Sequence, residues 1–133
     1  MSTQAISTYE NNEGTETAYD KPIQGAALFR ATVTRRFQGD LSGESVAEVL
    51  ICRAASDRIG YVATDRFTGR LDGRIGSCVI QHGGPIDRGV LQSFGYIVPG
   101  SGIDGLHGLR GQVRITVTAE GQHTLTLDYD FEA

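Results

Sequence analysis

The chain has 133 residues, which is enough for one domain with its own hydrophobic core. Its formal net charge is -4 and it has no run of Lys and Arg, which argues against nucleic acid and anionic lipid as partners. No apolar stretch follows a basic N-terminal segment or reaches membrane-spanning length, so we expect a cytoplasmic protein. Cys52 and Cys78 lie in strand-like segments, where reduced core thiols are expected and a disulfide is the lesser alternative.

The elements predicted along the chain are all β-strands. Residues 1–26 are the least certain part, with one strand expected at 2–10. Alternating apolar and polar residues, separated by turn residues, then predict strands at roughly 27–38, 44–53, 58–71, 74–82, 88–98, 111–118 and 122–131. About eight antiparallel strands in chain order fit a closed up-and-down barrel that forms a single domain over residues 1–133. A two-sheet sandwich is the alternative.

Asp72-Gly73 sets the register of the central hairpin. This dipeptide between two alternating runs predicts a type I′ turn, because both central residues of that turn need a positive φ. Ala63 then lies opposite His82. One face, which we predict points into the barrel because the other face is polar, collects Tyr61, Ala63, Asp65, Phe67, Cys78, Ile80 and His82.

The final hairpin is interpreted in the same way. A three-residue turn over 119–121, with Gly121 in the left-handed conformation, places Val117 opposite His123 and keeps the apolar residues on one face.

The residues predicted to face outward include Arg66, Arg70, Thr116 and Thr126. The aromatic residues predicted to face the lumen include Phe29, Phe37, Phe94, Tyr96 and Tyr129. A lumen lined in this way predicts a small-molecule pocket, with a plain packed core as the alternative.

Three polar residues of the predicted inner face could carry chemistry. His82 lies near one rim, and Tyr61 and Asp65 are its diagonal neighbours on the paired strand. Asp65 bound to one imidazole nitrogen would fix the tautomer and leave the other nitrogen for proton transfer, while Tyr61 could donate to a developing oxyanion. We therefore predict His82, Asp65 and Tyr61 as the catalytic residues. A buried polar cluster that only fixes strand register is the alternative.

A second candidate group consists of Arg35, Glu44 and Glu48. If residues 39–42 form a four-residue turn, Arg35 lies inward between the two carboxylates. Arg35 would then orient a carboxylate or carbonyl of a ligand, and Glu48 would act as a base. If the turn is one residue shorter, the side chains point outward; a rim salt bridge is a further alternative.

The glycine-rich segment at 99–110 contains a literal G-x-G-x-x-G pattern without the β-α-β context of a dinucleotide site. We interpret it as a tight loop that could cover a barrel mouth. His107 and His123 lack partners at ligand spacing, so we expect neither a metal nor a cofactor.

Several short motifs together resemble a known family. They are Asp65-Arg66-Phe67, Leu71-Asp72-Gly73-Arg74, Gln81-His82-Gly83-Gly84, Val98-Pro99-Gly100-Ser101-Gly102 and Leu127-Asp128-Tyr129-Asp130. The set resembles a bacterial family of unknown function that is similar to allene oxide cyclases and, more distantly, to dirigent-type proteins. The resemblance covers about residues 27–131 and implies an eight-stranded antiparallel barrel with an aromatic-lined lumen, often in an oligomer.

The resemblance also implies a cofactor-independent cyclase or isomerase that shapes an unsaturated, apolar metabolite in the lumen, in secondary metabolism. Holding the substrate close to its reacting geometry would then supply most of the rate enhancement. The expected substrate-binding residues are Phe67, Cys78, Ile80, Gln92, Phe94, Tyr96, Arg35, Glu48, Phe29 and Tyr129. A protein that binds a hydrophobic metabolite without turnover is the alternative. The expected partners are this small molecule and further copies of the chain.

Overall fold

The computed structural model describes residues 2–12 and 14–132, which form one antiparallel sheet. The strands are β1 (Thr3–Asn12), β2 (Glu16–Asp20), β3 (Ala27–Gly39), β4 (Leu41–Ala55), β5 (Arg58–Leu71), β6 (Arg74–Asp87), β7 (Val90–Leu91), β8 (Phe94–Ile97), β9 (Ile103–Asp104), β10 (Leu109–Val117) and β11 (His123–Phe131). The described residues include no helix that is long and apolar enough to cross a membrane.

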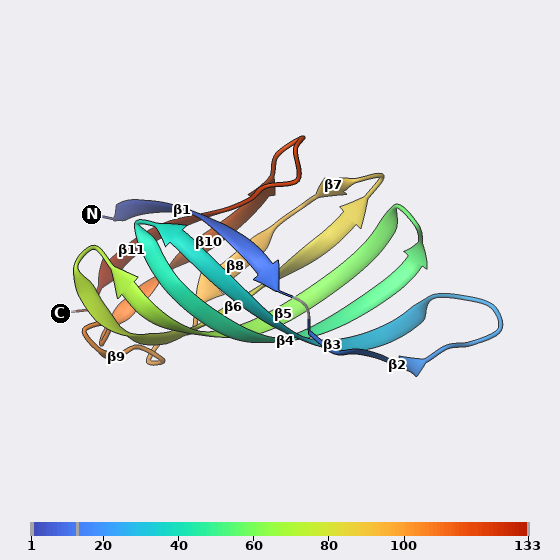
Figure 1. The fold of residues 1–133 in the computed structure, drawn as a ribbon, viewed down its shortest axis with the longest axis horizontal. Coiled ribbons are helices and arrows are strands. Elements are labelled where there is room, and N and C mark those ends of the chain that lie inside the picture. Colours follow the sequence, from blue (N-terminus) through green and yellow to red (C-terminus); the bar gives the residue numbers. More distant parts are fainter. Residues whose placement is uncertain (1, 13, 133) are drawn as a thin grey trace.

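Eight of these strands close into a barrel. The order around it is β1-β11-β10-β8-β6-β5-β4-β3, and β1 pairs with β3 to complete the ring (Figure 1). The first half of β3 pairs with β2 instead, so the β2–β3 hairpin extends beyond the barrel wall (Figure 1). The predicted closed antiparallel barrel is therefore confirmed, and closure pairs the edges that an open sheet would leave exposed.

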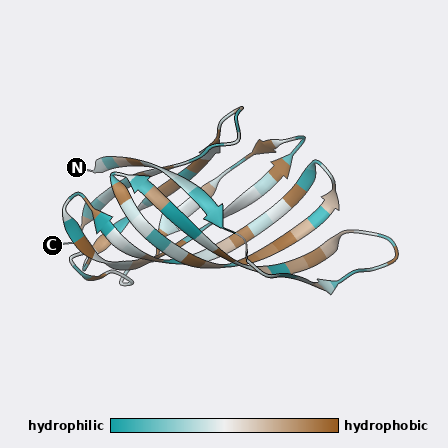
Figure 2. Ribbon diagram, in the orientation of Figure 1, coloured by the Kyte–Doolittle hydropathy of each residue, from teal (hydrophilic) through white to brown (hydrophobic). Residues whose placement is uncertain are grey.

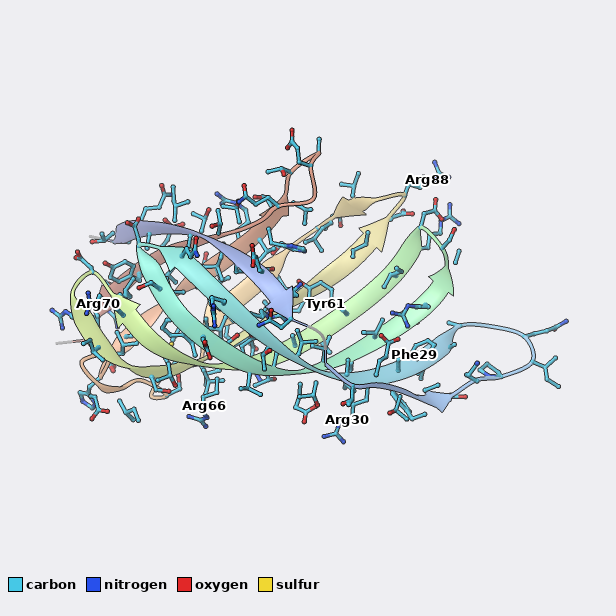
Figure 3. The ribbon with its side chains drawn as sticks, viewed as in Figure 1. Phe29, Arg30, Tyr61, Arg66, Arg70 and Arg88 are labelled. Atoms are coloured by element: carbon cyan, nitrogen blue, oxygen red, sulfur yellow. The ribbon has the colours of Figure 1, made fainter. Side chains whose placement is uncertain are left out.

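Both predicted turns set the register as expected. Asp72 and Gly73 have φ values of 50° and 80°, and Ala63 pairs with His82. Gly121 has a φ of 87°, and Val117 pairs with His123. The inner face of the central hairpin is therefore the predicted one, and hydrophobic and hydrophilic residues alternate along the strands (Figure 2). In Figure 3, Tyr61 points into the barrel whereas Arg66 and Arg70 point away from it.

The strand predicted at 88–98 is wrong in part, and the faces of its aromatic residues are reversed. The segment forms β7 and β8, and a two-residue turn at Arg88-Gly89, with φ values of 52° and 81°, places Gly95 opposite His82. Gly95 is therefore the inward residue, while Phe94 and Tyr96 face outward and are 48% and 41% exposed. A Cβ atom at Gly95 would lie 3.0 Å from the His82 Cβ and 3.1 Å from the Val113 Cβ, so a larger residue beside the imidazole would require these neighbours to shift.

Large side chains fill one end of the barrel. Leu106 is completely buried there and lies in the glycine-rich loop, whose Gly105 N–H donates a hydrogen bond to the Ile75 carbonyl oxygen at 2.8 Å. The loop thus closes the packed end of the barrel. The largest fully buried side chains of this core are Phe67, Leu41, Leu71, Ile80, Leu106, Leu109 and Leu127.

Small side chains line the inner wall at the other end. This second cluster contains Ala31, Ala47 and Ala63 together with Val49. Because these residues reach only a short distance into the lumen, this half of the barrel is not filled by its own side chains.

One prediction about an individual residue needs correction. Cys78 is buried in the core, but Cys52 is half-buried and lines a groove on the outer face; both cysteines are free thiols. Thr126 faces outward between Ile6 and Arg114, as predicted, yet it is only 9% exposed because its neighbours on the adjacent strands cover it.

Candidate functional site

The unfilled half of the barrel holds a cavity of about 780 Å³. This volume lies within the range of about 300–1,000 Å³ that is usual for small-molecule sites. The lining includes Ile59, Gly89 and Val117, which lie near the β4–β5, β6–β7 and β10–β11 turns. The cavity is therefore at the mouth of the barrel. Its main apolar lining residues are Val33, Val49, Ile51, Ile59, Ile86, Leu91 and Ile115.

A layer of polar residues separates this cavity from the packed core. On β5 the inward residues run from Ala63 through Asp65 to Phe67, and on β3 they run from Val33 through Arg35 to Phe37. The alternation of each strand therefore continues without interruption, but one inward position carries a charge. Pairing across the sheet brings these positions together with Ser45 and His82.

Asp65 lies at the centre of the polar layer and is 1% exposed. Its Oδ2 accepts hydrogen bonds from Arg35 Nε at 2.8 Å and from Ser45 Oγ at 2.7 Å. Its Oδ1 lies 2.9 Å from His82 Nε2. Arg35 Nη1 also donates to Asn11 Oδ1 at 2.8 Å, which ties strand β1 to the layer. Both oxygens of the buried carboxylate are therefore satisfied, as a buried charge requires.

The carboxyl group of Asp65 is ionised. Burial acts to raise its pKa, but the hydrogen bond from His82 and the charge of Arg35 outweigh burial and lower the pKa to about 2. Because an ionised carboxylate only accepts hydrogen bonds, His82 Nε2 must carry the proton in this contact. The carboxylate thus fixes the orientation of the imidazole.

Tyr61 connects the buried layer to the cavity. Its hydroxyl lies 3.2 Å from His82 Nδ1, and Tyr61 itself lines the cavity. Burial raises the pKa of Tyr61, so the side chain is a neutral phenol. Asp65, His82 and Tyr61 form a continuous hydrogen-bonded series that ends at the cavity surface, and such a series can carry a proton in either direction.

The structure brings together the three residues predicted as catalytic, with one difference in their roles. We expected the second nitrogen of His82 to be left for proton transfer with a substrate, but it contacts the Tyr61 hydroxyl. His82 is 3% exposed and does not line the cavity, so Tyr61 is the member of the group that can touch a ligand there.

The second predicted group is only partly correct. Arg35 faces inward and lines the cavity, but it pairs with Ser45 because the β3–β4 connection has a different length from the four-residue turn assumed. Glu44 and Glu48 therefore face outward, where Glu48 pairs with Arg30. The inward partner of Arg35 is Asp65, so Glu48 is not a base of this cavity.

Most of the other residues predicted to bind substrate do not line the cavity. Phe67, Cys78, Ile80 and Tyr129 are packed in the closed end, and burial raises the pKa of the Cys78 thiol to about 12. Phe29 lies on the inner side of β3 but packs against Arg53. The residues that are exposed on the outer surface are Gln92, Phe94 and Tyr96.

Two aromatic residues of the cavity were missed from the sequence. Tyr9 and His123 both line it, and their rings lie 5.1 Å apart. Burial, followed by the nearby Arg35 charge, lowers the pKa of His123. The Val117–His123 pairing could have indicated His123, whereas Tyr9 lies in the N-terminal part whose pairing could not be inferred. Within residues 2–12 and 14–132, no group of three His, Cys, Asp or Glu side chains is arranged to hold a metal ion.

Comparisons with known proteins agree with this fold. A family model described as a protein of unknown function (DUF3224) matches residues 5–129. A solved structure from the same family, a protein of unknown function from Shewanella oneidensis MR-1, shares 31% sequence identity and has a TM-score of 0.89. That match covers 100% of this chain and 99% of the Shewanella chain. No curated protein sequence matches the chain. The predicted membership of a family of unknown function is confirmed, and the chain belongs to the DUF3224 family.

Proposed function

We propose that this protein is a cofactor-independent isomerase or cyclase that moves a proton within an unsaturated, apolar metabolite held in the barrel lumen. One observation carries the proposal: the buried Asp65–His82 pair contacts the hydroxyl of Tyr61, which lines an otherwise largely apolar cavity. A protein that only stores an apolar ligand does not need a buried carboxylate and imidazole behind the ligand site. Burying the Asp65 charge costs free energy.

The proton transfer follows from the contacts. In the resting state His82 donates Nε2–H to Asp65, and Tyr61 donates its O–H to His82 Nδ1. When the Tyr61 oxygen takes a proton from the substrate, the original Tyr61 proton passes to His82, and the Asp65 carboxylate stabilises the imidazolium. The reverse transfer delivers a proton to another atom of the substrate. No net proton is gained or lost, so the product has the same formula as the substrate.

In this mechanism Tyr61 is the catalytic residue, because it touches the substrate. His82 and Asp65 are positioning residues that set the basicity of Tyr61. We extend the proposal to a role in secondary metabolism, which the resemblance to allene oxide cyclase-like and dirigent-like barrels would imply, and to a cytoplasmic homo-oligomer. Those barrels, like the one proposed here, would control a reactive substrate mainly through the shape of the lumen.

The second candidate function is a binding protein for a hydrophobic metabolite. The size and apolar lining of the cavity favour this function as much as catalysis. The two candidates differ only in whether the Tyr61 hydroxyl exchanges protons with the bound molecule.

Deuterium exchange can separate the two functions. A panel of unsaturated medium-chain ketones, alcohols and epoxides is incubated with the protein in deuterated water, and mass spectrometry follows deuterium incorporation and isomer formation. We expect the wild-type protein to exchange or isomerise at least one member, and Tyr61→Phe to slow this step by about 10²–10⁴-fold. A panel member that binds without any exchange would instead support the binding protein.

Tyr96→Phe is the matched control for this experiment. Tyr96 is also a tyrosine with a hydrogen-bonded hydroxyl, but it donates to Gln81 on the outer face at 2.8 Å. Removing that hydroxyl should leave exchange unchanged. Circular dichroism of both variants confirms that the fold is intact.

A further inference from the structure

The Tyr9 hydroxyl is a polar group of the cavity that the proton transfer does not use. Tyr9 is 5% exposed and its ring is held between Phe37 and His123, with centroid distances of 5.1 Å to each. Its hydroxyl takes part in none of the hydrogen bonds among the described residues. Tyr9 also lines the cavity, so we infer that its hydroxyl is available to a bound ligand.

The charges around the cavity select a neutral ligand. Two cationic side chains line it, and each is already bound to a carboxylate, Arg35 to Asp65 and Arg53 to Glu16. The lining contains no Asp or Glu, and the lowered pKa of His123 keeps that imidazole neutral at neutral pH. Within the described lining, neither a carboxylate ligand nor an amine ligand finds an unpaired opposite charge, so either would lose its hydration without compensation.

Tyr9 lies where it can stabilise negative charge. The Arg35 guanidinium carbon is 5.7 Å from the centre of the Tyr9 ring, and burial raises the pKa of Tyr9, which therefore remains a hydrogen-bond donor. Tyr61 cannot serve as this donor in the resting state, because its proton is directed at His82. A preorganised hydrogen-bond donor in a largely apolar cavity can stabilise negative charge that develops on a ligand oxygen.

We propose that the substrate is a neutral carbonyl compound and that Tyr9 is a second catalytic residue, which donates a hydrogen bond to the carbonyl oxygen. This inference rests on the proposed function, since it assigns the oxygen that receives the electron pair when Tyr61 removes a proton from the adjacent carbon. The Tyr9 hydrogen bond strengthens as charge develops on that oxygen. The oxygen returns to a carbonyl when the proton is delivered to a different carbon.

Ligand displacement tests this assignment without requiring turnover. Diphenylhexatriene, a fluorescent hydrocarbon with no oxygen, reports occupancy of the lumen. Methyl octyl ketone, decanoate and decylamine are then compared as competitors at neutral pH. We expect the ketone to displace the dye at a concentration about tenfold below that of either charged competitor.

Tyr9→Phe removes only the hydroxyl, which has no partner in the described chain, so the variant should fold. We expect it to weaken ketone binding by about five- to tenfold while the affinity for the hydrocarbon dye is unchanged. Tyr129→Phe is the matched control, because Tyr129 is also 5% exposed but does not line the cavity, and its substitution should leave ketone binding unchanged.

The outcomes separate this inference from the proposed function. Preferential binding of decanoate, or equal ketone binding by wild type and Tyr9→Phe, would overturn the carbonyl assignment even if the protein exchanges protons in deuterated water. The expected ketone preference in a protein that never exchanges protons would leave Tyr9 as a ligand-binding residue and overturn its catalytic role. Failure of the hydrocarbon dye to bind would overturn both proposals.

Discussion

The packed end and the open end of the barrel are built from the same strands but differ in side-chain volume. On β5 the inward residues are Phe67 and Leu71 at the packed end and Ala63 at the open end. On β4 they are Leu41 at the packed end and Ala47 at the open end. The inward residues named here are apolar at both ends. The size of the inward residues, not their polarity, therefore decides where the barrel is core and where it is cavity.

The polar layer lies at the boundary between these two ends. Burying Asp65 and Arg35 costs free energy, and their mutual hydrogen bond offsets part of this cost. At the packed end such charges would replace good apolar contacts. At the boundary they give the cavity a polar floor, so the same residues that limit the core also form the candidate site.

The largest expected effect is the loss of turnover when a residue of the polar layer is replaced. His82→Ala and Asp65→Asn should each lower kcat by about 10²–10⁴-fold, because either change removes the oriented imidazole behind Tyr61. The double variant should be little worse than either single variant, since the two residues act as one unit. The measurement is the initial rate of proton exchange on the panel member that the wild type turns over.

Separate measurement of kcat and KM distinguishes the loss of a positioning residue from a general disruption of the fold. Loss of His82 should lower kcat and leave KM nearly unchanged, because the imidazole does not line the cavity. Asp65→Asn also leaves Arg35 buried without its counter-charge, which should cost about 3–5 kcal/mol of stability, so unfolding is measured in parallel. Gln81→Ala, which changes the outward neighbour of His82 on β6, is the control and should retain full activity.

The next effect compares the two ends directly. Phe67→Ala should lower the free energy of unfolding by about 3–5 kcal/mol, because it leaves a cavity in a fully packed region. Val49→Ala, which enlarges a cavity that already exists, should cost about 1 kcal/mol. Urea unfolding of both variants measures the difference. Equal costs would mean that the open half is packed as tightly as the core.

Acid should weaken the polar layer through Asp65. Its pKa of about 2 lies below the ordinary value of 3.8, so between these values the unfolded protein binds more protons than the folded protein. The stabilisation is therefore fully present above about pH 5 and is lost as the pH falls through about 2, by about 2 kcal/mol in total.

Urea unfolding at a series of acidic pH values measures this loss. Asp130→Asn, which changes a carboxylate paired with Arg110 on the surface, should retain the acid-dependent loss, because that pair is exposed. Asp65→Asn should show a smaller decrease than the wild type over the same interval. An identical decrease in the wild type and Asp65→Asn would show that other groups govern acid stability.

The sequence was sufficient for the parts that depend on short turns. Asp72-Gly73 fixes the pairing of β5 with β6, and that pairing alone brings Tyr61, Asp65 and His82 together. The partner of Asp65 could not be predicted, because Arg35 reaches it only through the β3–β4 connection, whose length is ambiguous in the sequence.

The role of Asn11 and the faces of Phe94 and Tyr96 were not predicted from the local sequence, for two different physical reasons. The contribution of Asn11 depends on the pairing of β1 with β3, which closes the barrel across a long stretch of chain. The inward faces predicted for Phe94 and Tyr96 assumed the parity of one continuous strand at 88–98, which the structure divides into β7 and β8. Here the small Gly95 lies in the tight space beside His82, and the turn at Arg88-Gly89 could have indicated this register.

The smallest expected effects lie on the outer face of the same strands. Arg66 alternates with Asp65 and Phe67 along β5 and points away from the barrel (Figure 3), and none of its contacts among the described residues is an ion pair. Arg66→Ala and Arg70→Ala should therefore change the free energy of unfolding by no more than about 0.5 kcal/mol. Urea unfolding beside Phe67→Ala provides the comparison. If the arginine variants were as destabilised as Phe67→Ala, the assignment of inner and outer faces would be wrong, and with it the assignment of Tyr61 and Asp65 to one site.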